Sequence, residues 1–254
     1  MEVHHPHHPT HKKNISEYFL EFFMLFFAVT LGFFAENVRE NLSNREKEKA
    51  IIESLKVDLI KDTAQLNYLI NDYPNKIEYW NDSLHNLIDH ESIKDNEGKF
   101  LQAIVNSTIW QYYSAGEVAL SLTSNTESMN LIENEKIKTQ LLDYKKNEKY
   151  YSEYLKFIVN TFQQTDTSIL SISELKSFRP VFGKATLNDL FIDISGIPKD
   201  FGFKTFDKSI LKAHIRNIDH ADLKVYDLKT IYSMLLVNEK DILKTIREDY
   251  SKNK

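Results

Sequence analysis

The strongest constraint on this chain is an apolar run near its start, YFLEFFMLFFAVTLGFFA, which covers residues 18–35 and contains one charged side chain, Glu21. As an α-helix, about 18 residues at about 1.5 Å each span about 27 Å, close to the thickness of the hydrocarbon core of a bilayer. A helix in a soluble core usually carries polar side chains every third or fourth position, whereas from Phe22 onward only Thr30 and Gly32 interrupt the apolar side chains. The run therefore predicts a transmembrane helix over residues 16–36.

Two other interpretations of this run stay open, a cleaved signal peptide and the buried core helix of a soluble protein. A signal peptide requires a small residue three positions before its cleavage site. A cut after Ala35 would place Phe33 there, which favours an anchor that is retained.

The orientation of the anchor is less constrained. Lys12 and Lys13 precede the run, and four basic residues follow it between positions 39 and 49, so the Lys and Arg count alone would place the C-terminal part in the cytoplasm. The basic pair is also typical of a signal-anchor, the later basic residues alternate with glutamates, and large domains translocate largely regardless of charge. We expect the N-terminus inside and the following domain outside, in the periplasm of a bacterial cell.

One face of the predicted anchor carries its small residues. The residues of this association face follow each other at spacings of four, three, four and three, and they are Glu21, Leu25, Ala28, Gly32 and Ala35. A small-xxx-small pattern such as Ala28 to Gly32 lets two helices approach closely in lipid, and a protonated Glu21 could hydrogen-bond across the pair. We expect self-association through this face; the alternative is that Glu21 reaches back to the headgroups.

A flexible tail over residues 1–15 precedes the anchor and concentrates five histidines, His4, His5, His7, His8 and His11. Imidazoles at this density can bind Zn, Cu or Ni, and the interrupting prolines prevent a helix. Loose, incidental metal contacts explain the tail equally well. The five histidines are therefore weak candidate metal ligands, and the sequence assigns no metal site and no cofactor.

For the remaining chain, residues 37–254, the sequence predicts a mainly α-helical domain. Its first part, residues 37–50, is a charged stalk, and a helical bundle follows. Apolar residues recur at helical spacings and predict helices over about 36–72, 75–90, 100–106, 133–163, 209–218 and 222–250. Four tyrosines of the fourth helix are expected at the bundle seam, Tyr144, Tyr150, Tyr151 and Tyr154. Residues 178–207 are rich in Gly, Pro and Phe and predict an irregular or β-hairpin cap.

No catalytic motif stands out in this part. The densest candidate cluster is His214, Asp219, His220 and Asp222, at an expected turn between helices where Asp222 would cap the last helix. Its spacing matches no HExxH motif, so we expect no enzyme. The net charge of −5 is spread among interspersed acidic and basic residues without a basic patch, which argues against nucleic acid. The absence of cysteine excludes disulfides and thiolate chemistry.

The segment from Ser16 to Asn41, SEYFLEFFMLFFAVTLGFFAENVREN, after a His-rich start, resembles the N-terminus of a family of uncharacterised single-pass membrane proteins of Bacteroidetes-type bacteria. The stretches YYSAG at 112–116 and MNLI at 129–132 loosely resemble the middle region of that family. The resemblance implies a single-span anchor in a bacterial inner membrane and supplies no catalytic residues.

The sequence as a whole favours a membrane-anchored scaffold or interaction protein of the bacterial cell envelope, with the lipid bilayer and either a second copy or another membrane protein as partners. The alternative is a sensory or ligand-binding module, and the third is metal binding by the histidine tail. A cleft lined by convergent polar groups would favour ligand binding, whereas a flat exposed apolar patch would favour the scaffold.

Overall fold

The computed structural model describes residues 14–108, 111–172 and 202–250. These residues are mainly helical, and no β-strand occurs among them. The chain divides into two compact units, Met1–Ile51 and Ile52–Lys254. The predominantly helical fold confirms the coarse prediction from the sequence, while the predicted cap at 178–207 lies mostly outside the described residues.

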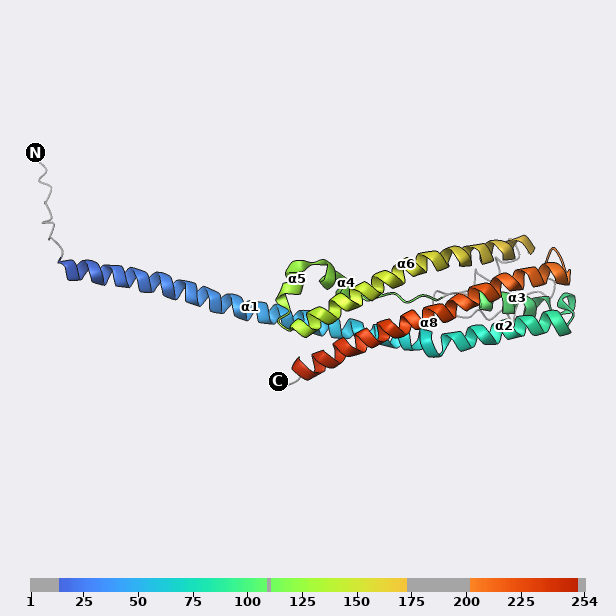
Figure 1. Ribbon diagram of the computed structural model, residues 1–254, viewed down its shortest axis with the longest axis horizontal. Coiled ribbons are helices and arrows are strands. Elements are labelled where there is room, and N and C mark those ends of the chain that lie inside the picture. The colour runs from blue at the N-terminus through green and yellow to red at the C-terminus, as the bar shows by residue number, and fades with distance from the viewer. Residues whose placement is uncertain (1–13, 109–110, 173–201, 251–254) are drawn as a thin grey trace, which may run out of the picture. The chain divides into compact units, whose positions relative to one another are not determined.

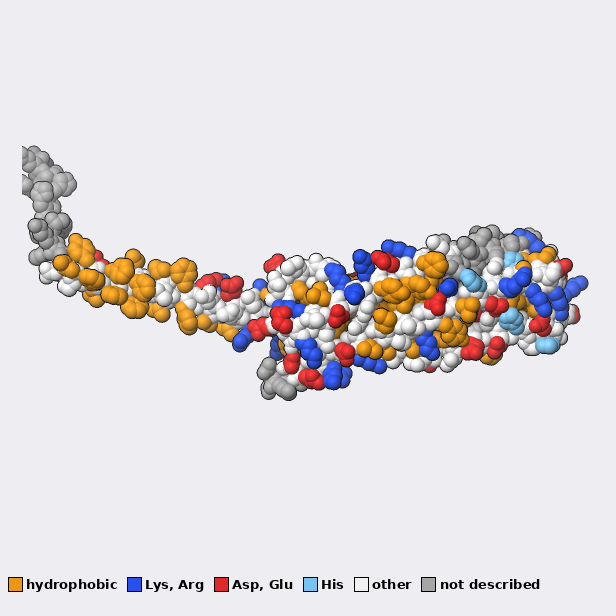
Figure 2. All heavy atoms as spheres, viewed as in Figure 1, with side chains coloured by type: hydrophobic (Ala, Val, Ile, Leu, Met, Phe, Trp, Pro, Cys, Tyr) orange, Lys and Arg blue, Asp and Glu red, His pale blue; other side chains and the backbone are white. Residues whose placement is uncertain are grey.

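The first unit is formed by the N-terminal part of helix α1, Ile15–Asn71. Every described residue from 14 to 42 is exposed, and hydrophobic side chains cover this segment in Figure 2. Helix α1 continues without a break from the predicted anchor through the predicted stalk at 37–50. This helix contains the only segment, among the described residues, that is long and apolar enough to cross a membrane, and none of that segment is buried.

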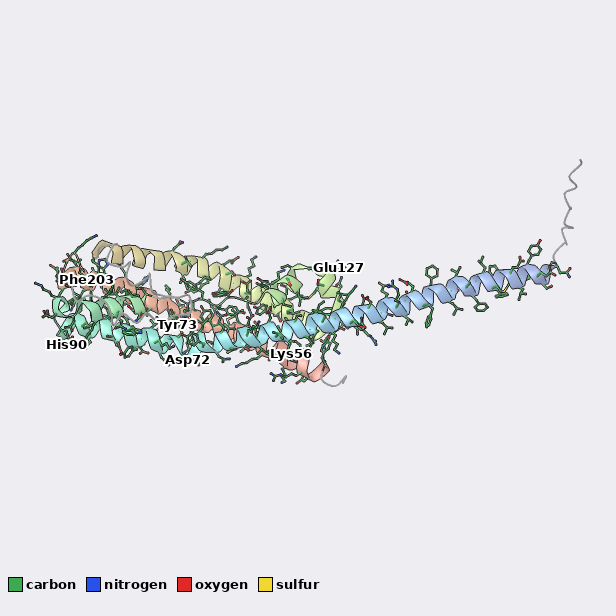
Figure 3. All side chains as sticks on the ribbon, turned by 180° about the vertical axis from the view of Figure 1, so that it is seen from behind. Lys56, Asp72, Tyr73, His90, Glu127 and Phe203 are labelled. Carbon is green, nitrogen blue, oxygen red and sulfur yellow. The ribbon has the colours of Figure 1, made fainter. Side chains whose placement is uncertain are left out.

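The second unit contains the C-terminal part of α1 and the remaining helices (Figure 1). They are α2 (Tyr73–His90), the 3₁₀ helix η1 (Ile93–Asp95), α3 (Glu97–Ser107), α4 (Glu117–Ser124), α5 (Thr126–Leu131), α6 (Glu135–Ile172) and α8 (Lys208–Tyr250). Helix α2 begins directly after α1, because Pro74 in its first turn lacks an N–H and cannot continue the hydrogen bonding of α1. In Figure 3 Asp72 and Tyr73 lie at this junction.

The long helices of the second unit lie side by side. Helix α6 packs along α8, α2 packs against α3 and α8, and α4 packs against α5 and α6. At one end of the bundle, where Figure 3 shows His90 and Phe203, a core cluster joins α2, α3, the end of α6 and the start of α8. Further along, the apolar stripe of α1 is also buried, with Leu55, Leu59 and Leu66 fully enclosed.

Helix α8 corrects the prediction of two helices separated by a turn near 219–221. The helix is continuous from Lys208 to Tyr250, because the stretch contains no Gly or Pro and its apolar stripe runs on through Ile215, Ile218 and Val225. Asp222 therefore lies within the helix, on the buried stripe, and does not cap a helix.

Helix α6 is longer than predicted and ends at Ile172. Tyr144 and Tyr151 are buried at the bundle seam as expected. Tyr150 was expected there too, but its side chain is 55% exposed, and Tyr154 is half-buried. The prediction for Tyr150 is wrong because adjacent residues of one helix point about 100° apart, and Tyr151 takes the inward direction.

Candidate functional site

An acidic cleft of about 280 Å³ lies between helices α2 and α8. Each helix turns one face toward the cleft, because residues three or four positions apart lie on the same side of a helix. The lining residues therefore recur at these spacings along α2 and α8. The polar side chains that line the cleft are Glu78, Asn81 and Asp82 from α2 and Asp219 and Asp222 from α8. No lysine or arginine lines it among the described residues, so four carboxylic acid groups surround the cleft without a basic lining residue.

Asn81 links the two helices at this cleft. Its Nδ2 donates to Oδ2 of Asp222 at 2.7 Å and to Oδ1 of Asp219 at 3.1 Å. His85, one turn further along α2, lies with Nε2 2.9 Å from the same oxygen of Asp219. Asp219 therefore has two partners, whereas Oδ1 of Asn81 and Oδ1 of Asp222 are buried and have no hydrogen-bond partner among the described residues.

Asp222 is the most buried acid of this cleft, with 8% of its surface exposed. Burial, and to a smaller extent the negative charge of Asp219, raise its pKa to about 8. At neutral pH the carboxyl of Asp222 is thus mostly protonated when the cleft is empty. A cation in contact with it would favour the ionised form.

The walls of the cleft are apolar. Ile77 is buried at its floor, and the exposed side chains of Leu223 and Tyr226 lie at its rim. Acid groups beside apolar walls suit a ligand that carries both a positive charge and a hydrocarbon part.

The cleft brings together two of the four residues of the cluster expected from the sequence, Asp219 and Asp222. His214 is half-buried, and burial lowers its pKa. His220 is exposed, and neither histidine lines the cleft. The acids of α2 were missed, although Glu78 and Asp82 are four residues apart in a predicted amphipathic helix.

A second polar cluster is enclosed in the bundle and centres on the hydroxyl of Tyr113. This hydroxyl donates to Oε1 of Glu239 at 2.6 Å, lies 2.8 Å from the hydroxyl of Tyr144 and 3.3 Å from Oδ2 of Asp62. Glu239 is fully buried, and its Oε2 has no hydrogen-bond partner in the described part of the chain. Burial raises the pKa of Glu239 to about 8, against the hydrogen bond from Tyr113, which lowers it.

The same cluster fixes the segment that precedes α4. The N–H of Gly116 donates to Oδ2 of Asp62 at 2.7 Å, and the N–H of Val118 donates to Oδ2 of Asp58 at 2.8 Å. The hydroxyl of Tyr151 donates to the carbonyl of Tyr113 at 2.8 Å. These contacts hold a segment without regular structure against α1 and α6, which indicates a structural role for this cluster.

The association face predicted in the anchor lies on one helix, α1. Glu21, Leu25, Ala28, Gly32 and Ala35 are all exposed, and a Cβ added at Gly32 would meet no atom within 4 Å. The face is thus open to a partner helix in the first unit taken alone.

No group of three or more His, Cys, Asp or Glu side chains in the described ranges is arranged to hold a metal ion. The five histidines of the tail lie outside those ranges. A comparison of the chain with protein-family models, with curated proteins and with solved structures finds no match. The resemblance of the anchor to a bacterial membrane-protein family therefore stays a prediction.

Proposed function

We propose that this chain is a single-pass anchored interaction protein of the bacterial inner membrane, without catalytic activity, which presents a helical bundle on the periplasmic side. The observation that carries the proposal is the exposure of every residue from 15 to 42 on α1, including all the phenylalanines of the apolar run. Exposed apolar surface of this extent is costly in water, and lipid removes the cost.

An aromatic strip on α6 supports an interaction role for the bundle. Tyr150 and Phe157 are 55% and 59% exposed, and Tyr154 lies between them with ring centroids 6.5 and 6.2 Å from its two neighbours. Exposed aromatic side chains in contact with one another are typical of surfaces that bind other proteins.

Fractionation of cells that express the full chain tests the anchor. We expect the protein in the membrane pellet after a carbonate wash, with its intact N-terminus, and released only by detergent. Recovery of the uncleaved, monodisperse chain in the supernatant would contradict the proposal. A topology reporter fused after Lys254 would give the orientation, and activity on the cytoplasmic side would reverse the periplasmic part of the proposal.

Self-association through the anchor is tested by crosslinking in membranes. Gly32→Ile places a branched side chain on the association face, whereas Thr30→Ile places the same side chain on the opposite face of the helix. We expect Gly32→Ile to reduce the crosslinked dimer and Thr30→Ile to leave it unchanged. Equal dimer yields in the two variants would remove this part of the proposal.

The acidic cleft favours a second function, that of a ligand-binding module. The cleft has convergent polar groups and apolar walls, which are the features expected of a small-molecule site. Binding in the cleft and anchoring in the membrane are compatible, because the cleft lies wholly within the second unit.

A further inference from the structure

We propose that the acidic cleft between α2 and α8 binds a small organic cation, an aliphatic primary amine or diamine, through the unpartnered oxygens of Asn81 and Asp222. This inference rests on the second function above, ligand binding by the bundle, and is independent of the anchor.

The first argument is the hydrogen-bond balance of the cleft. Oδ1 of Asn81 and Oδ1 of Asp222 are both buried acceptors without a partner in the described part of the chain. A buried polar atom without a partner is costly. The two residues are joined by a hydrogen bond of 2.7 Å, so their free acceptors belong to one site. An ammonium group has three N–H donors and no acceptor, so it matches these two oxygens once Asp222 has lost its proton and both side chains have turned toward the cleft.

The second argument is charge. The acids at the cleft, Glu78, Asp82, Asp219 and Asp222, have no lysine or arginine beside them in the lining. His85 on α2 contacts Asp219 through Nε2 and does not line the cleft. A second ammonium on a diamine would therefore find carboxylates at the outer part of the cleft.

The third argument separates an amine from a metal ion. A hard divalent cation needs several oxygens converging on one point, and the acids of this cleft do not form such a group. The methylenes of an aliphatic amine would in turn lie against Ile77, Leu223 and Tyr226, which a hydrated metal ion would leave unused. The cleft thus suits donors spaced along a hydrocarbon chain.

Calorimetric titration of the full chain in detergent micelles with 1,4-diaminobutane tests the proposal. We expect saturable binding at one site, weakened about 10- to 100-fold by Asp222→Asn, since a charge-assisted hydrogen bond is lost. Asp241→Asn is the matched control, because this exposed acid lies on the same helix outside the cleft, and we expect it to bind like the wild type.

Proton release provides a second readout. Titrations at pH 7 in two buffers of different ionisation enthalpy should show that binding releases close to one proton from wild type and none from Asp222→Asn. Asp82→Asn, at an exposed position, keeps the test valid if Asp222→Asn does not fold. We expect Asp82→Asn to weaken the binding of the diamine more than the binding of 1-aminobutane.

Several results would overturn the proposal. They are no heat of binding in the millimolar range, equal weakening by Asp241→Asn, or displacement of the diamine by an equal concentration of Mg²⁺. Equal affinity for tetramethylammonium, which has no N–H donor, would also refute it. The anchor is tested separately by fractionation, so failure here leaves the membrane function standing.

Discussion

Glu239→Gln should remove a pH-dependent weakness from the bundle. Glu239 is fully buried and its pKa is raised from 4.5 to about 8. Between these values the folded state binds more protons than the unfolded state, so the free energy of unfolding falls as the pH rises. A shift of one pKa unit corresponds to about 1.4 kcal/mol. The shift of Glu239 therefore lowers the free energy of unfolding above pH 8 by at most about 5 kcal/mol.

The groups that face Glu239 set this direction. Tyr113 donates a hydrogen bond to it and favours its charged form, while the negative charge of Asp62 on α1 and burial favour the neutral form. Tyr144 on α6 contacts Tyr113 and supplies no positive charge. Glutamine has the shape of the protonated acid and keeps an oxygen for Tyr113, so at pH 5 the substitution should change little.

The assay is urea unfolding of the full chain in micelles, followed by helical circular dichroism at several pH values from 5 to 8. We expect Glu239→Gln to match wild type at pH 5 and to be more stable by about 2 to 5 kcal/mol at pH 8. Glu248→Gln is the control, because this exposed acid on the same helix should leave the pH dependence unchanged. A constant difference between wild type and Glu239→Gln at every pH would refute the reasoning.

Three further substitutions test the packing. Gly116→Ala should destabilise the bundle by about 1 to 3 kcal/mol, because the new Cβ would lie 2.5 Å from an Asp58 oxygen. Gly98→Ala is the control and should cost far less, because a Cβ there would meet nothing within 4 Å. The midpoints of urea unfolding compare the two variants. Leu84→Ala, at a fully buried position, should cost about 2 to 5 kcal/mol by the same assay, against under about 0.5 for Leu142→Ala at an exposed one. Removal of the Tyr113 hydroxyl by phenylalanine should cost about 2 to 4 kcal/mol near neutral pH, because Glu239 then loses the hydrogen bond that Tyr113 donates to it.

The helices of this chain were largely predictable, because their apolar residues recur at helical spacing. The end of α1 at Asn71 and the helix up to His90 follow from Pro74 and from that period. The turn expected near Asp219 was wrong for a physical reason. Polar residues between 217 and 222 suggested a break, yet the helix continues because this stretch contains no Gly or Pro. The buried apolar stripe of α8 also continues through it, and Asp222 is the polar residue that lies on that stripe.

The candidate site was only half predictable. Asp219 and Asp222 stood out as neighbours in the sequence, but their contact with Asn81 joins residues more than a hundred positions apart. Periodicity assigns each residue to a face of its own helix and does not say which face of another helix lies opposite. The short helices α4 and α5 were missed for a related reason, since α5 has six residues and no buried side chain, so no apolar stripe marks it.

Two carboxyls with a similarly raised pKa have different meanings in this fold. Glu239 has no exposed surface and its hydrogen bond from Tyr113 belongs to a closed network that also holds the segment before α4. Asp222 shares the burial but lines a cleft that a ligand can enter, and its free oxygen is accompanied by a second free acceptor on Asn81. The buried charge alone therefore does not distinguish a structural acid from a binding acid. The surroundings do, because Asp222 lines a cleft whereas Glu239 is enclosed in the bundle.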